Sequence, residues 1–149
     1  MSTNRVVVQV GGECFSIPGP ALRLATLASP GLTNHVVRHI QANTTQTQQS
    51  VACNALHTLE ARLCRWLLMS DDRTATGKLN LTQEYLSLML GVQRTTVTRA
   101  ASDLQAAGSI RYVRGRIDIV DRHQLEAGAC ECYLAVKENN KRLIGSVAA

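Results

Sequence analysis

Two arginines and two threonines, spaced to share one face of a helix, have the most specific chemistry in this sequence. Arg94 and Thr98 are four residues apart, as are Thr95 and Arg99. An arginine binds guanine through two hydrogen bonds in the major groove of DNA, and a threonine methyl group contacts that of thymine. We therefore predict that these four side chains contact bases. A solvated helix face that happens to carry two arginines is the alternative.

The residues around these arginines predict two short helices joined by a tight turn. Thr82 has the side chain to cap a first helix over 83–90. Gly91 then supplies the backbone freedom that a sharp turn requires. A second helix follows over 94–107, and a glycine ends it. Gln93 precedes the second helix on its outward side, where we predict a phosphate contact.

The relative positions of Ser87, Gly91 and Val97 indicate that these helices form a helix-turn-helix motif. Ser87 is small enough for the two helices to touch, Gly91 lies four residues later at the turn, and Val97 is β-branched and faces inward. The remaining core positions hold Leu86, Leu90, Val92 and Ala100.

A β-hairpin, or wing, is predicted after the second helix. Residues 110–113 and 117–120 alternate like strands around Arg114-Gly115-Arg116. Arginines at a turn contact phosphates and fix the register of a protein on a duplex, so we predict phosphate contacts from Arg114 and Arg116. From residue 82 to 116 there are five basic and two acidic residues. A solvated hairpin without DNA contacts is the alternative.

A long and mainly polar helix with one narrow apolar stripe is predicted before the motif. The sequence has no glycine or proline from residue 32 to 57. Such a stripe is typical of a helix that pairs with another helix, although packing on its own domain is the alternative. A hinge is expected over 53–58. The predicted dimer-interface residues are Leu32, Val36, Ile40, Thr47 and Val51.

The rest of the chain has weaker signals. A polar loop is expected over 71–78. The other expected elements are short strands over 6–10 and 14–17, helices over 20–28, 58–70 and 121–133, and a frayed tail from 137.

Composition excludes several classes of protein. The chain has 149 residues, of which 45% are hydrophobic and 18% charged, which is ordinary for a globular protein. The net charge of +5 favours an acidic partner such as nucleic acid. Aromatic residues are only 3%, which argues against the stacking platforms of single-strand binders. Without a membrane-spanning run or a signal peptide, we expect a cytoplasmic protein with no membrane partner.

The five cysteines do not predict a metal site or a disulfide framework, because none lies in a Cys-x-x-Cys pair. Cys53 and His57 are four apart, but no third group that would orient a catalytic nucleophile accompanies them, so we expect no enzyme. His57 and Cys64 are expected to be packing residues. Cys130 and Cys132 would point about 200° apart on a helix, which disfavours a redox switch between them. No metal ligand or cofactor is predicted.

At residues 81–99, LTQEYLSLMLGVQRTTVTR, and 104–110, LQAAGSI, the sequence resembles the C-terminal part of CRP/FNR-type bacterial transcription regulators. Cys53-Asn54 and residues 60–68 and 114–117 also match, and the resemblance covers roughly 6–136. It implies that 32–54 is a dimerisation helix and that 94–107 is a recognition helix. Residue by residue, it implies base reading by Arg94 and Arg99 and a phosphate contact by Thr82. Thr95 stands where the family often has glutamate, so the usual half-site is in doubt.

The resemblance also implies a mainly α fold, with a long dimerisation helix followed by a winged helix-turn-helix domain that carries a small β-hairpin. The implied divisions are remnant β-roll strands (1–20), a short helix and the dimerisation helix (21–55), the DNA-binding domain (56–136) and a flexible tail (137–149). Residues 5–17 are too few for the roughly eight strands that enclose a ligand. No cyclic-nucleotide pocket, haem site or iron–sulfur site is therefore expected.

The function expected from these features is sequence-specific binding of double-stranded DNA by a homodimer that regulates transcription. The alternative is a short interaction protein that pairs through the long helix with a full-length regulator, a paralogue of this chain. RNA polymerase is a further partner to consider, although no segment of the sequence marks a surface for it.

Overall fold

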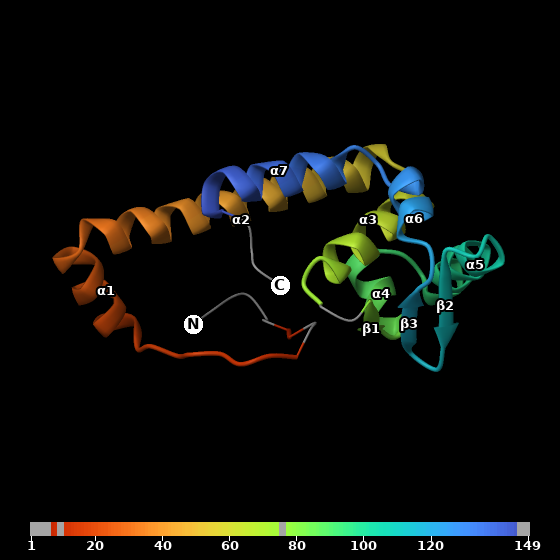
Figure 1. Ribbon diagram of the computed structural model, residues 1–149, viewed down its shortest axis with the longest axis horizontal. Coiled ribbons are helices and arrows are strands. Elements are labelled where there is room, and N and C mark those ends of the chain that lie inside the picture. The colour runs from red at the N-terminus through yellow and green to blue at the C-terminus, as the bar shows by residue number, and fades with distance from the viewer. Residues whose placement is uncertain (1–6, 9–10, 75–76, 146–149) are drawn as a thin grey trace.

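The computed structural model describes residues 7–8, 11–74 and 77–145. Helix α2 (Pro30–Leu56) forms the long axis, with helix α1 (Gly19–Ala28) at one end and a group of helices and strands at the other (Figure 1). The predicted fold class, a long helix followed by a winged helix-turn-helix, is confirmed. Within the described residues, no helix is long and apolar enough to cross a membrane.

The group at the end of α2 contains the predicted helix-turn-helix motif and wing. Along the chain, its elements are α3 (Leu59–Asp71), β1 (Lys78–Asn80), α4 (Gln83–Leu90), α5 (Arg94–Ala106), β2 (Ile110–Val113), β3 (Arg116–Ile119), α6 (Arg122–Gly128) and α7 (Cys132–Ile144).

Side chains at the helix starts explain where several helices begin. The Thr58 hydroxyl accepts a hydrogen bond from the backbone N–H of Ala61 in the first turn of α3. The Thr82 hydroxyl does the same for Tyr85 in α4, at 3.1 Å. Each bond satisfies one of the backbone donors that a helix start leaves unpaired. The predicted cap at Thr82 is confirmed.

The hydrophobic core lies under α3. Leu63, Leu67 and Leu68 on this helix are completely buried. They belong to one cluster with apolar residues of α4, α5, the sheet and α6. Buried members from those elements are Leu86, Leu90, Val97, Ala100, Ile117 and Leu125.

The wing belongs to a three-stranded antiparallel sheet with the order β1-β3-β2. The sequence predicted only the hairpin of β2 and β3 and assigned Lys78 to a loop. Leu79 in β1 pairs with Ile117 in β3, and both side chains are buried. Because β1 has only three residues, its alternation was too short to predict a strand.

The predicted N-terminal strands are not confirmed. Residues 14–17 form no strand and are exposed, so that prediction is wrong. In the predicted strand over 6–10, Val7 and Val8 have no regular secondary structure. Residues 6, 9 and 10 lie outside the described residues. A strand needs a neighbour to pair its backbone groups, and residues 14–17 pair with no other described strand.

The C-terminal predictions also need correction. The single helix expected over 121–133 is two helices, because the chain becomes extended at Ala129 after α6. The frayed tail expected from residue 137 is wrong as far as Ile144, since α7 continues to that residue. Tyr133 and Val136 are buried and attach α7 to the core. Residues 146–149 of the predicted tail lie outside the described part.

Helix α7 packs beside α2, and the two run in opposite directions (Figure 1). Arg38 on α2 donates a hydrogen bond to the backbone carbonyl of Arg142 near the end of α7, at 3.1 Å. The residues on the face of α2 that packs against α7 recur at intervals of three and four positions, and they are buried or half-buried. They are Ala42, Thr45, Gln46, Gln49 and Cys53.

Candidate nucleic-acid interface

The turn between α4 and α5 has the geometry that the sequence predicted. Gly91 lies in the left-handed region, with φ 66° and ψ 35°. The backbone N–H groups of Gly91 and Val92 both donate to the carbonyl of Ser87, which closes the end of α4. A side chain at Gly91 would strain this conformation. Residues 83–106 therefore form two helices rather than one rod.

A buried arginine that the sequence analysis did not single out supports this turn. Arg62 on α3 is 9% exposed and donates a hydrogen bond to the carbonyl of Leu90, the last residue of α4. A cation at the C-terminal end of a helix interacts favourably with the helix dipole. Arg62 thus fixes α4 relative to the core and does not reach the interface itself.

The inward and outward faces of α5 are as predicted. Val97 and Ala100 are buried, at 0% and 1% exposed. Arg94, Thr95 and Arg99 are exposed on the outside. Gln93 precedes the helix, is exposed and makes no side-chain cap. The first turns of α5 therefore present two arginines to the solvent.

Thr98 differs from the other predicted base-contact residues because it is half-buried. Its hydroxyl donates to Oε1 of Gln83 at 3.0 Å and lies 2.9 Å from the carbonyl of Arg94. Arg94 Nε also lies 3.5 Å from the same Gln83 oxygen. Since the hydroxyl proton of Thr98 is engaged inside the protein, its methyl group is the better candidate for a base contact.

The tip of the wing is a two-residue turn with left-handed backbone at both positions. Arg114 has φ 46° and Gly115 has φ 82°. Positive φ at both central residues is the requirement of a type I′ hairpin turn. A Cβ atom at Gly115 would lie 3.4 Å from the methyl group of Thr82. The wing tip therefore lies against the start of α4.

Three of the four predicted phosphate-contact residues, all except Gln93, are thereby brought together. Thr82 lies at the start of α4, next to the turn that carries Arg114 and Arg116. Both arginines are exposed. Arg116 Nε lies 3.4 Å from Asp118 Oδ1, so part of its charge is compensated within the wing. Within the described residues, no ion pair involves Arg114. Its charge is therefore more available for a phosphate than the charge of Arg116.

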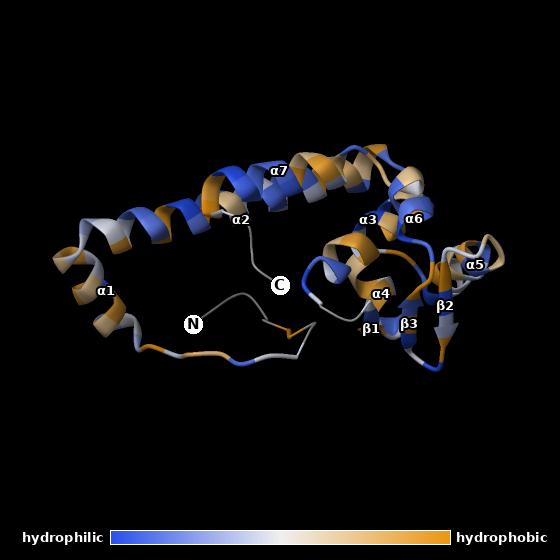
Figure 2. Cartoon of the chain, viewed as in Figure 1, coloured by the Kyte–Doolittle hydropathy of each residue, from blue (hydrophilic) through white to orange (hydrophobic). Residues whose placement is uncertain are grey.

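The predicted dimer-interface residues lie on the face of α2 away from α7. Ile40 and Val51 are 60% and 67% exposed, and Thr47 is exposed as well. Leu32 and Val36, nearer to α1, are half-buried. Figure 2 shows hydrophobic and hydrophilic residues alternating along α2. Within the described residues, no segment of the chain covers Ile40, Thr47 and Val51.

The structure also brings together four side chains that the sequence analysis treated separately. Cys53, His57, Cys130 and Cys132 each offer a ligand atom, and these atoms all lie within 4.8 Å of one another. The spacings 53–57 and 130–132 were visible in the sequence. Their meeting was not, because the predicted helix over 121–133 placed the last two on opposite sides.

Cys64 lies outside this group and behaves as predicted. It is 1% exposed within the main core. Burial raises the pKa of its thiol to about 11. It is therefore a protonated packing residue at neutral pH.

Comparison with known proteins agrees with this arrangement of helices and wing. Residues 61–127 match the family of Crp-like helix-turn-helix domains. A CRP/FNR-family protein from Eubacterium rectale is 23% identical with a TM-score of 0.59, over 75% of this chain and 52% of that protein. FixK2 from Bradyrhizobium japonicum is 20% identical with a TM-score of 0.69, over 74% of this chain and 58% of that protein.

A third solved structure, a CRP-family transcriptional regulator from Thermus thermophilus, is 25% identical with a TM-score of 0.56. The match covers 63% of this chain and 51% of the regulator. No curated protein sequence matches the chain. The chain thus spans about half the length of the solved structures that it resembles.

The fold and the exposed arginines on α5 define a winged helix-turn-helix DNA-binding domain. More specifically, residues 61–127 match the Crp-like helix-turn-helix domains, and the resemblance of the chain to the C-terminal part of CRP/FNR-type transcription regulators is confirmed.

Proposed function

We propose that the protein binds specific sequences in double-stranded DNA as a homodimer and thereby regulates transcription. The observation that carries this proposal is one continuous surface. It runs from the exposed arginines of α5, through Gln83, which contacts Arg94, to Thr82 and the adjoining wing tip. The N-terminal half of a recognition helix that enters the major groove is the part that contacts base edges.

Within this surface, the roles divide by position. Arg94 and Arg99 are on the outward face of α5 and are assigned to base edges, together with Thr95 and the methyl group of Thr98. The residues around α5 are assigned to phosphates, because backbone contacts fix the orientation of the helix in the groove. These residues are Thr82, Gln93, Arg114 and Arg116.

The exposed stripe on α2 supports the homodimer. Helix α7 covers the face that includes Ala42 and Cys53. Ile40, Thr47 and Val51 point the opposite way and remain exposed. A helix that is apolar on a narrow stripe gains stability by pairing with the same stripe of a second copy. Two copies would then present two α5 helices to half-sites roughly 34 Å apart, one turn of DNA.

Selection of bound duplexes from a random DNA pool at physiological salt tests the proposal. We expect a palindromic consensus, because a twofold dimer reads the same half-site twice. The affinity for that consensus should fall steeply with salt, since each phosphate contact releases counterions. Recovery of unrelated duplexes with no consensus would overturn sequence-specific binding.

Light scattering on the full chain, with and without the selected duplex, tests the homodimer separately. We expect two chains per duplex. A stable monomer that binds DNA weakly, and that forms a mixed dimer when a full-length regulator is added, would instead identify an interaction protein. In that case, the stripe on α2 would serve a different partner.

A further inference from the structure

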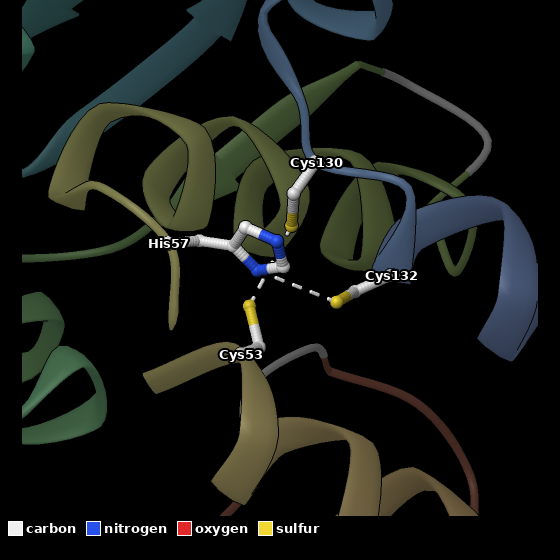
Figure 3. Close-up of side chains that lie close together, drawn as sticks. All are labelled: Cys53, His57, Cys130 and Cys132. Carbon is white, nitrogen blue, oxygen red and sulfur yellow. Dashed lines mark hydrogen bonds between the residues drawn. The ribbon is translucent and has the colours of Figure 1, made fainter. Parts of the chain in front are cut away.

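Three sulfur atoms and one imidazole converge where α2 ends and α7 begins (Figure 3). Cys53 is in the last turns of α2, and His57 is the residue that follows this helix. The backbone N–H of His57 donates to the carbonyl of Cys53 at 3.1 Å, so the helical turn persists and both side chains point the same way. Cys130 enters from the segment between α6 and α7, and Cys132 is the first residue of α7.

We propose that Cys53, His57, Cys130 and Cys132 form a structural site for one divalent metal ion of the zinc type. Three thiolates and one imidazole are a ligand set that suits Zn²⁺, while Mg²⁺ and Ca²⁺ prefer oxygen ligands. This proposal concerns a different part of the molecule from the DNA-binding surface and does not depend on it.

The distances are those of a nearly assembled tetrahedron. With Zn–S and Zn–N bonds of about 2.3 and 2.05 Å, two sulfurs around one ion lie about 3.8 Å apart, and a sulfur and a nitrogen about 3.6 Å apart. Cys53 Sγ and Cys130 Sγ are 3.5 Å apart, and Cys132 Sγ lies 3.6 Å from His57 Nδ1. The remaining pairs are within 4.8 Å. Side-chain shifts of about 1 Å or less therefore complete the site.

The surroundings of the four ligands are those of a closed, structural metal site. The three cysteines are buried, at 0%, 8% and 1% exposed for Cys53, Cys130 and Cys132. With four protein ligands, no coordination position is left for a substrate, which distinguishes structural from catalytic zinc sites. The site therefore supplies stability and not reaction chemistry.

Two neighbouring side chains orient the ligands. His57 directs Nδ1 at the sulfurs, while its Nε2 lies 3.1 Å from Oε1 of Glu131. A carboxylate that accepts the second ring N–H is the usual support of a histidine that binds metal. Gln49 Nε2 donates to Cys132 Sγ at 3.0 Å, an interaction that a thiolate would strengthen.

A single ion fits this geometry better than the other uses of clustered cysteines. A two-iron cluster distributes its four protein ligands over two metal atoms, whereas these ligand atoms all lie close to one point. A disulfide between Cys53 and Cys130 would need a bond of about 2.05 Å and would leave His57 and Cys132 without a common partner. The convergence of all four side chains is explained by the metal alone.

The ion would join two parts of the chain far apart in sequence. Two of its ligands lie where α2 meets α3, and the other two lie just before α7 and at its first residue. The site would therefore fix the long helix to the DNA-binding domain at the link formed by His57 and Thr58. We expect metal removal to loosen this junction while the core under α3 remains folded.

Metal analysis of the full chain tests the site directly. Protein purified under reducing conditions, stripped with a chelator and incubated with Zn²⁺, should retain one zinc ion per chain after gel filtration. Replacing Zn²⁺ by Co²⁺ should give the visible absorption bands of a tetrahedral ion and the near-ultraviolet charge-transfer band of cobalt–thiolate bonds. Mg²⁺ should not bind.

Variants locate the site. Cys53→Ser, Cys130→Ser and Cys132→Ser should each remove the retained zinc and change the cobalt spectrum. Cys14→Ser, at an exposed cysteine, and Cys64→Ala, at a buried cysteine of the main core, are the controls and should retain one ion. Glu131→Gln should weaken zinc binding by about tenfold, because it removes the carboxylate that supports His57.

Four results would overturn the proposal. The first is an absence of retained zinc in the reconstituted wild-type chain. The second is a cobalt spectrum without thiolate bands, and the third is equal loss of zinc in Cys14→Ser and Cys132→Ser. A Cys53–Cys130 disulfide in protein kept under reducing conditions, detected by mass spectrometry, would also refute it, since those sulfurs could not then bind the ion.

Discussion

The DNA-binding domain and the long helix α2 are stabilised in different ways. Of the 13 residues of α3, eight are buried, and five of these belong to the hydrophobic core. Of the 27 residues of α2, only Ala42 and Cys53 are buried. The DNA-binding domain is stabilised by its own apolar core. Helix α2 has almost no buried residues of its own and is stabilised by the segments that pack beside it.

Because of this difference, we expect the two regions to have different roles. The core under α3 holds α4, α5 and the wing in fixed positions, which a surface that reads DNA requires. Helix α2 has α7 and the cysteine–histidine group on one side and an exposed apolar stripe on the other. Its stability therefore depends on α7 and, in the proposed dimer, on a second copy, so changes there should alter assembly more than folding.

The largest expected effect is in the core of the domain. Leu67→Ala should lower the free energy of unfolding by about 2–5 kcal/mol, because it leaves a cavity at a completely buried position. Urea unfolding followed by circular dichroism measures this loss. Leu134→Ala, at a residue of α7 that is 58% exposed, is the control and should change the stability by less than about 0.5 kcal/mol. Similar losses in both variants would contradict the assignment of the core.

The same kind of truncation on α2 should affect assembly instead. Ile40 is 60% exposed in the single chain, so Ile40→Ala should hardly change the unfolding of the domain. If it is buried between two copies, the loss of about 1 kcal/mol per chain makes the dimer about thirtyfold weaker. Sedimentation equilibrium measures the dimer affinity.

The control for this variant is Gln41→Ala, on the flank of α2, which should leave the dimer unchanged. A dimer affinity unaffected by Ile40→Ala would show that the stripe does not form the interface. The DNA-binding domain would keep its role in that case, but another surface would have to bring two copies together.

The features that the sequence predicted correctly are those set by residues close together in the chain. The caps at Thr58 and Thr82, the turn at Gly91 and the wing were predictable because each depends on residues within a few positions of one another. The outward position of Arg94 followed from the inward position of Val97, since both are on one helix of regular period.

Features that depend on distant segments were missed. The last helix was predicted as a tail because residues 137–142 are polar, and only the contact with α2 shows why they are helical. Cys130 was placed on a continuous helix that in fact ends at Gly128. The convergence of Cys130 with Cys53 required the positions of three helices, which local patterns do not give.

Within the DNA-binding domain, the arginines of α5 should act differently from basic residues elsewhere. Arg99→Ala should reduce discrimination at one base pair of each half-site by about 1–3 kcal/mol, because it removes the guanidinium that we propose forms two hydrogen bonds to a base. Competition binding with duplexes that vary at single positions measures this. Arg23→Ala, on α1 at the opposite end of α2, is the control and should preserve the sequence preference. Equal weakening on specific and random DNA by Arg99→Ala would contradict its role in reading bases.

The smallest expected effect concerns Arg114 at the wing tip, where stability and binding should change in opposite directions. Its φ of 46° is unfavourable for arginine, and asparagine tolerates this conformation better. Arg114→Asn should therefore stabilise the domain, by about 0.5 kcal/mol. It should also weaken binding to all duplexes alike and reduce the slope of log affinity against log salt by about 0.9 for each phosphate that the side chain no longer neutralises. Thermal unfolding and salt titrations measure the two effects. A more stable variant with an unchanged salt slope would show that Arg114 does not contact phosphate, whereas a less stable one would show that its backbone conformation is not strained.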